Sequence, residues 1–343
     1  MTDLNERNIR KYIGTIARNI WGKDREVKIL EAVEVKEETY VNYIFRVTVM
    51  VDEVKQVCYL RQTRDHVKTR PEMKIEADRI LFEAKILNLI GEIVTDLVPQ
   101  VLYLDKRNNV AVLSDIKREG KLLVEQLVSG NAYPATGKYF GKVIGMIHRD
   151  TLGVENTRVR GGEEENQKAI DFHLGMRLGP AQKMYPEPVE RLIEDSKKSV
   201  KTMVMGDLAS KNIFVDGQKV RFLDLERAFV WDAAFDLAFL FCHYLIEIKP
   251  RNISESVEFI KNFLASYKQQ MGKVLTGSEL KNLENRVIRY LGVTILYRLF
   301  GFYLVRDLKR DKEGWKIQAE KMLGTNETNL VIFLTKCEAV LNK

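Results

Sequence analysis

The stretch that most constrains the fold runs over residues 202–245, where short apolar segments alternate with acidic and amide side chains. A segment rich in Val and Met ends shortly before Asp207, and Asn212 follows five positions later, directly before a second apolar segment. An Asp-Gly pair after that segment predicts a tight hairpin. A third apolar segment then leads to Asp224, with Glu226 two positions on. The sequence therefore predicts a strand and a hairpin that gather these polar groups at one rim.

Three carboxylates and an amide are costly to bring together unless a cation or a substrate uses them. Such oxygen ligands suit Mg²⁺, which takes one or two carboxylates together with waters and phosphate oxygens. The spacing from Asp207 to Asn212, with Asp224 at the end of the next hairpin, matches the layout of kinase-type phosphoryl transfer. In that layout the first Asp accepts the proton of the substrate hydroxyl, the Asn holds one metal ion, and the second Asp holds the metal ions against the nucleotide. Each residue alone could be a turn former or a strand cap, but the ordered set favours a site.

Composition and charge indicate a soluble globular protein. Of the 343 residues, 45% are hydrophobic and 30% are charged, which provides enough apolar material for a large core. The net charge of +7 is modest and forms no basic stripe, so no nucleic-acid partner is expected. The longest apolar runs carry charges and the first ten residues are polar, so neither a membrane span nor a secretory signal is expected. Three scattered cysteines are typical of buried thiols in a reducing cytoplasm.

The first third of the chain is predicted to form a β-rich lobe. Hydrophobic periodicity predicts a helix over residues 3–20, a charged loop over 64–74 and a helix over 74–90 that ends at Gly91. Strands are predicted over residues 28–36, 42–51, 54–61, 98–104 and 110–113. We expect a five-stranded antiparallel sheet with the second helix inserted after its third strand.

Beyond residue 116 the pattern turns helical. Residues 153–168 are rich in Gly, Glu and Arg, and a surface loop or lid is expected there. Helices are predicted over residues 122–127, 139–148, 169–178, 187–198, 235–248, 252–270, 277–307 (broken near Gly292 or Gly301), 311–322 and 327–341. The expected class is α+β with two lobes. Residues 1–116 would form the nucleotide-binding lobe and residues 117–343 the helical lobe for catalysis and substrate binding, with the nucleotide between them.

Motifs in this order resemble the aminoglycoside phosphotransferase and choline kinase group, which shares the two-lobed protein-kinase-like fold. The most specific match is Asp-Leu-Glu-Arg-Ala-Phe at residues 224–229 with Phe-Asp-Leu at 235–237, similar to D-P-E-F-A-F and G-F-D in that group. Within the group the pattern most resembles the 5-methylthioribose kinases. Weaker matches lie at residues 78–87, 97–101, 114–116, 130–134 and 298–308.

The resemblance implies an enzyme with ATP and Mg²⁺ as cofactors and a small-molecule hydroxyl as acceptor, most of all a sugar such as a pentose or thiopentose. Asp207 would be the catalytic base, and Asn212, Asp224 and Glu226 would bind the metal. The implied nucleotide contacts are Asn42, Arg61, Glu83, Ser114, Asp115 and Ile116. The candidate substrate contacts are Trp231, Tyr297 and Arg298.

Two departures keep other functions open. Arg61, expected to pair with Glu83, stands where the resembled kinases normally have Lys, and the loop at residues 37–42 lacks the usual glycines. A nucleotide-binding pseudokinase that serves as an interaction module is therefore an alternative. Within the kinase class, choline, an amino-acid hydroxyl and an aminoglycoside are alternative acceptors. The choice between ATP and GTP is left open, as is a homodimer, which the resembled kinases often form.

Overall fold

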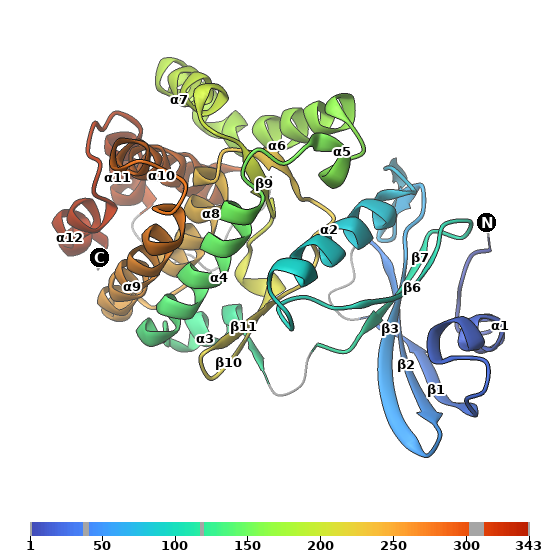
Figure 1. Ribbon diagram of the computed structural model, residues 1–343. Coiled ribbons are helices and arrows are strands. Elements are labelled where there is room, and N and C mark those ends of the chain that lie inside the picture. Colours follow the sequence, from blue (N-terminus) through green and yellow to red (C-terminus); the bar gives the residue numbers. More distant parts are fainter. Residues whose placement is uncertain (1, 37–40, 117–119, 302–311, 342–343) are drawn as a thin grey trace. The chain divides into compact units, whose positions relative to one another are not determined.

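The computed structural model of the chain describes residues 2–36, 41–116, 120–301 and 312–341 (Figure 1). The glycine-free loop at residues 37–40, the expected join at 117–119, and Asp307 and Leu308 lie outside the described residues. The chain divides into two compact units, Met1–Arg118 and Glu119–Lys343, and each is described by itself.

A five-stranded antiparallel sheet with the order β1-β2-β3-β7-β6 forms the first unit, as expected. Its strands are β1 (Val27–Glu34), β2 (Tyr43–Val51), β3 (Val54–Gln62), β6 (Val101–Asp105) and β7 (Val110–Ser114). Helix α2 (Arg79–Ile93) is inserted after β3. It was expected to end at Gly91 but continues through it, and the backbone N–H of Val94 still donates to the backbone oxygen of Ile90. The expected charged loop contains a small hairpin, β4 (His66–Val67) with β5 (Arg70–Lys74).

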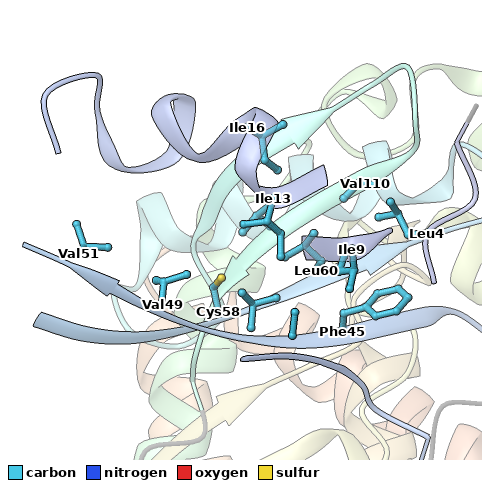
Figure 2. Packing of buried hydrophobic residues seen from close by; sticks show 13 residues of the cluster. Leu4, Ile9, Ile13, Ile16, Phe45, Val49, Val51, Cys58, Leu60 and Val110 are labelled. Atoms are coloured by element: carbon cyan, nitrogen blue, oxygen red, sulfur yellow. The ribbon is translucent and has the colours of Figure 1, made fainter. Parts of the chain in front are cut away.

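The core of the first unit lies between the sheet and helix α1 (Ile9–Trp21), shown in Figure 2. Ile9, Ile13 and Ile16 recur at helical spacing and are buried on one side of the helix. Phe45, fully buried on β2, belongs to the same cluster. The apolar residues that alternate along the strands and those that recur at helical spacing on α1 thus form one buried layer, as the sequence predicts.

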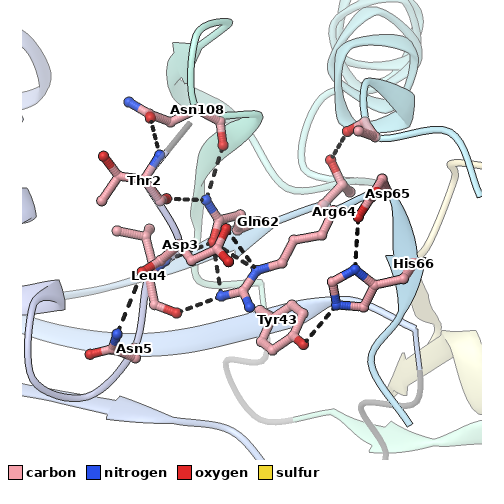
Figure 3. A network of polar contacts seen from close by, with 12 residues as sticks. Thr2, Asp3, Leu4, Asn5, Tyr43, Gln62, Arg64, Asp65, His66 and Asn108 are labelled. Atoms are coloured by element: carbon pink, nitrogen blue, oxygen red, sulfur yellow. Dashed lines mark hydrogen bonds and ion pairs between the residues drawn. The ribbon is translucent and has the colours of Figure 1, made fainter. Parts of the chain in front are cut away.

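A polar network ties the N-terminal segment to the end of β3 (Figure 3). The buried side chain of Gln62 donates to the backbone oxygen of Thr2 and accepts from the backbone N–H of Leu4. Arg64 donates to the backbone oxygen of Leu4, and its guanidinium carbon lies 3.5 Å from the centre of the Tyr43 ring. These contacts satisfy backbone groups that would otherwise be unpaired beside the sheet.

The second unit is mainly helical and contains two small antiparallel sheets, β11-β10-β8 and β12-β9. The strands are β8 (Lys121–Leu122), β9 (Thr202–Val204), β10 (Ile213–Asp216), β11 (Lys219–Phe222) and β12 (Phe229–Trp231). The helices are α3 (Leu123–Ser129), α4 (Gly137–Asp150), α5 (Asn156–Val159), α6 (Glu163–Met184), α7 (Pro186–Lys198), α8 (Ala234–Ile246), α9 (Ile253–Met271), α10 (Gly277–Phe300), α11 (Lys312–Leu323) and α12 (Leu330–Leu341). The expected α+β class is confirmed.

Residues 153–168, expected as a loop or lid, instead contain α5 and the start of α6 (Figure 1). Three glutamates form the first turn of α6, where acidic side chains stabilise the positive end of the helix dipole. Helix α10 runs through Gly292 and ends before Gly301. A Cβ at position 292 would lie only 2.6 Å from the backbone oxygen of Ala319 on α11, so the glycine allows the two helices to pack closely.

Among the described helices, none combines the length and the apolar character that a membrane crossing requires. All three cysteines are buried and free, as expected. Burial raises the pKa of the Cys58 thiol to about 12, so this thiol stays protonated and unreactive at neutral pH.

Candidate active site

The β10–β11 hairpin brings Asn212 beside the start of the Asp-Leu-Glu segment. Ile213 pairs with Phe222 in the hairpin, and the backbone N–H of Leu223 donates to the backbone oxygen of Asn212 at 2.8 Å. Asp224 follows at once with a φ of 61°, in the left-handed region that Asp tolerates better than most residues. The short hairpin therefore places the expected amide and carboxylate on adjacent segments.

Asp207 and Asn212 contact each other directly. The Asn212 amide nitrogen donates to Oδ2 of Asp207 at 3.1 Å and to the backbone oxygen of Asp207 at 3.2 Å. Because both bonds use Nδ2, the Oδ1 oxygen of Asn212 is the atom that can serve as a metal ligand. The Asp207 side chain is 22% exposed, so an acceptor hydroxyl can reach it.

Asp236, a buried residue in the first turn of α8, holds the loop before Asp207 through hydrogen bonds to its backbone. Asp236 accepts from the backbone N–H groups of Met205 at 2.6 Å and Gly206 at 3.0 Å. Gly206 has a φ of 76°, and a Cβ there would lie 2.2 Å from the backbone oxygen of Arg227. The loop that carries Asp207 therefore packs closely on the segment that follows Asp224 and Glu226.

The metal-ligand candidates form a small oxygen-donor set. Asp224 is partly exposed, whereas Glu226 is 5% exposed and its carboxylate lies 4.0 Å from Arg227 Nε. Within the described ranges, no three His, Cys, Asp or Glu side chains form a metal-binding group. Mg²⁺ at a nucleotide takes only one or two protein carboxylates. Asp224, Glu226 and the Asn212 oxygen are of the ligand types that Mg²⁺ bound to phosphates takes, and their roles as metal ligands stay predictions.

Helix α6 supplies polar residues to this region that the sequence analysis missed. Asn166 forms two hydrogen bonds with the backbone of Val230, at 2.7 and 3.1 Å. His173 lies 3.1 Å from the backbone oxygen of Arg227, and Arg177 donates to the carboxylate of Asp207 at 3.0 Å. The available signal was the spacing of polar residues at positions 166, 173 and 177, which repeats on one helical face.

The first unit holds the candidate nucleotide contacts. Arg61 donates to Glu83 at 2.8 Å and both side chains are buried, so the expected pairing is confirmed. The side-chain oxygen of Asn42 accepts a hydrogen bond from Arg79. Ser114 ends β7, and residues 115 and 116 follow it, Asp115 partly exposed and Ile116 buried. The roles of these residues toward a nucleotide remain predictions.

The three candidate substrate contacts lie at or near the interior of the second unit. Trp231 is buried and donates to the Tyr290 hydroxyl at 3.0 Å, which gives its indole a packing role. Tyr297 is also buried. Arg298 donates to Glu247 at 3.0 Å, so this cation has a carboxylate partner within the second unit.

Comparison with known proteins gives one similar sequence and several similar folds. No protein-family model matches the chain. Methylthioribose kinase from Bacillus velezensis is 23% identical over 312 residues, covering 78% of this chain and 77% of that protein.

Three solved structures cover nearly the whole chain. Plasmodium vivax ethanolamine kinase has a TM-score of 0.55 at 13% identity, and the match covers 98% of this chain and 89% of the ethanolamine kinase chain. Choline kinase from Cryptosporidium parvum has a TM-score of 0.53 at 16% identity, with coverages of 97% and 96%. Amicoumacin kinase has a TM-score of 0.52 at 15% identity, with coverages of 97% and 100%. The resemblance to the aminoglycoside phosphotransferase and choline kinase group is thereby confirmed, and the chain has the kinase-like fold of that group.

Proposed function

We propose that the chain is an ATP- and Mg²⁺-dependent phosphotransferase that transfers the γ-phosphoryl group of ATP to a hydroxyl of a small, sugar-like molecule. The observation that carries this proposal is the direct contact of Asp207 with Asn212, beside the segment that begins with Asp224. Kinase-type phosphoryl transfer needs this set of groups, because it depends on alignment and on charge stabilisation.

In this proposal Asp207 accepts a hydrogen bond from the acceptor hydroxyl and orients its oxygen toward the γ-phosphorus. As the new O–P bond forms, the bond from the γ-phosphorus to the β–γ bridging oxygen breaks, ADP leaves, and the hydroxyl proton passes to the Asp207 carboxylate. Asn212 and Asp224 would hold Mg²⁺, with Glu226 as a further ligand, and the bound ion neutralises charge on the phosphates. The hydrogen bond from Asn212 keeps the Asp207 carboxylate in a fixed orientation next to the metal ligands.

The nucleotide contacts are assigned to the first unit. Glu83 orients the Arg61 guanidinium, which is able to bind two phosphate oxygens at once. Asn42 and the backbone at residues 114–116 would complete the contacts to ATP. An Arg in this position is bulkier than Lys, so a pseudokinase that binds ATP without turnover is the competing function.

The sugar-like acceptor is supported by the relative named methylthioribose kinase. The fold relatives are named ethanolamine, choline and amicoumacin kinases, so amino alcohols and antibiotics are the competing acceptors. Tyr297 and Arg298 on α10 are proposed to shape the acceptor site, with Trp231 as a buried support. We also propose that the protein acts in the cytoplasm, as a monomer or as a homodimer.

The test measures ATP consumption with Mg²⁺ across pentoses, 5-methylthioribose, choline, homoserine and aminoglycosides. Turnover with one acceptor is expected to fall by about a thousandfold in Asp207→Asn. Asp171→Asn, at an exposed position of α6, is the matched control and should keep full activity. Equal turnover in the wild type and Asp207→Asn would contradict the assigned base. Mg²⁺-dependent ATP binding with no turnover of any acceptor would favour the pseudokinase.

A further inference from the structure

Arg177 approaches Asp207 from α6, whereas Asn212 lies on the same loop as Asp207. Arg177 Nη2 donates to Oδ1 of Asp207 at 3.0 Å, and Asn212 Nδ2 donates to Oδ2 at 3.1 Å. Each carboxylate oxygen therefore has one protein donor and keeps a lone pair for an acceptor hydroxyl. Two donors from separate elements fix the plane of the carboxylate more firmly than either could alone.

The environment of Arg177 is unusual for a cation. The side chain is 4% exposed, and its guanidinium carbon lies 3.8 Å from the centre of the Phe239 ring and 5.0 Å from that of Phe235. Among the described residues, Nε and Nη1 have no hydrogen-bond partner. Burial lowers the pKa of the guanidinium, but Arg stays charged at neutral pH. A buried cation with two unused donors opposes folding, so its benefit must come from its effect on Asp207.

Further positive charge lies near α6, from arginines on other segments of the chain. Burial, and then the charges of Arg177, Arg227 and Arg160, hold the pKa of His173 well below its ordinary value. His173 is therefore neutral, and its ring stacks on Phe229 at 4.6 Å between centres. The cations near the Asp207 loop thus come from arginines on three segments, which are the link before α6, α6 itself and the segment after Glu226. Their charge offsets that of the carboxylates there.

We propose that Arg177 is a positioning and specificity-determining residue that aligns Asp207 and disfavours cationic acceptors, which leaves uncharged or anionic hydroxyl compounds as the substrate class. The inference rests on the proposed phosphotransferase function. An ammonium alcohol is attracted by net negative charge at the acceptor site, and the guanidinium beside Asp207 cancels that charge. An uncharged polyol does not depend on this attraction.

The test compares kcat/KM for uncharged acceptors (5-methylthioribose, ribose) with that for cationic acceptors (choline, ethanolamine, kanamycin), using the full chain with Mg²⁺ and ATP. The wild type should prefer an uncharged acceptor by at least about a hundredfold. In Arg177→Met this preference should narrow by about tenfold or more, and kcat should fall by about tenfold. The melting temperature should change little, because Asp207 is 22% exposed and keeps Asn212 and water as partners, while the variant removes a buried cation with two unpaired donors. Arg191→Met, at an exposed position of α7, is the matched control and should change none of these values.

A second variant separates charge from geometry. Arg177→Lys keeps the charge but loses the planar fork, so kcat should fall while the preference for uncharged acceptors is retained. This variant also serves if Arg177→Met does not fold. Equal use of cationic and uncharged acceptors by the wild type would overturn the inference and leave the phosphotransferase function standing. The inference would also be overturned if Arg177→Met kept the full preference for uncharged acceptors, or if Arg177→Lys lost it. If the wild type turns over no acceptor, the proposed function fails, and the inference fails with it.

Discussion

Oδ1 of Asp236 accepts a hydrogen bond from the backbone N–H of Gly206 at 3.0 Å, one residue before Asp207. The other carboxylate oxygen accepts from the backbone N–H of Met205 at 2.6 Å and lies 3.4 Å from His148 Nε2. Asp236 is fully buried, so its charge is stabilised by these groups rather than by water. The first turn of α8 therefore sets the path of the loop that presents Asp207.

The Asp236→Asn variant tests this link. The amide nitrogen of Asn would face a backbone N–H, so one of the two hydrogen bonds is lost and a buried donor remains unpaired. We expect kcat to fall by about a hundredfold and the free energy of unfolding by about 2 kcal/mol. Steady-state kinetics and urea unfolding measure the two effects. Full kcat in a folded Asp236→Asn protein would show that α8 does not set the position of Asp207.

Gly206→Ala tests the contact between the two loops of the site. The left-handed backbone and the 2.2 Å approach of a Cβ to the Arg227 backbone oxygen both oppose a side chain at this position. We expect a loss of about 2–4 kcal/mol of stability and a strong decrease in kcat, because the loops must separate. Gly175→Ala on α6 is the control, since a Cβ there meets nothing within 4 Å. It should be neutral or slightly stabilising, and a similar loss in both variants would contradict the argument.

The parts of the site that could be predicted from sequence depend on short separations or on strong periodicity. Asn212 and Asp224 are joined by one hairpin, and the hairpin signal was plain. The alternating strands specified the five-stranded sheet, whereas the pairing of Arg61 with Glu83 was implied by the resemblance to the kinase group. For the hairpin and the sheet a local rule fixed the geometry, because the chain has little freedom between the residues concerned.

The rest depended on contacts between distant segments. Asp236 lies in a strongly apolar run, and nothing in that run indicates that its partners are the backbone amides of Met205 and Gly206. The start of α6 looked like a loop because its first turn has few apolar residues, although its glutamates are favourable at a helix start. Arg177 lies within the part of α6 that was predicted, over residues 169–178, but its contact with Asp207 joins two segments that are far apart in the sequence. These contacts arise from tertiary packing, which a single sequence does not reveal.

Phe45→Ala tests the core of the first unit. Phe45 is fully buried between the sheet and α1, so its removal leaves a cavity that the surrounding strands cannot fill (Figure 2). We expect a loss of about 3–5 kcal/mol in the free energy of unfolding. Val54→Ala, at a side chain that is 60% exposed on β3, should change it by less than about 0.5 kcal/mol. Urea unfolding compares the two variants, and equal losses would place Phe45 outside the core.

Glu247 connects α8 with α10 and with the segment that precedes Asn212. It accepts from Arg298 at 3.0 Å, lies 2.7 Å from His243 Nδ1 and accepts from the Ser210 hydroxyl. Burial acts to raise the pKa of Glu247, but His243, Arg298 and Ser210 together lower it from the ordinary value of 4.5. The ionised carboxylate is thus more stable in the folded chain than in the unfolded one.

A lowered pKa in the folded state predicts how Glu247 affects stability at acid pH. Its contribution should be complete above the ordinary value of 4.5 and should be lost as the pH falls through the lower folded value. Glu247→Gln should therefore be about 3 kcal/mol less stable than the wild type at neutral pH, because Arg298 loses its buried partner. The difference should shrink as the pH falls below about 4.5. Urea unfolding between about pH 7 and pH 3 measures it, with the exposed Glu258→Gln as the matched control. A difference from the wild type that stays constant over this range would mean that the Glu247 carboxylate is not preferentially ionised in the folded chain.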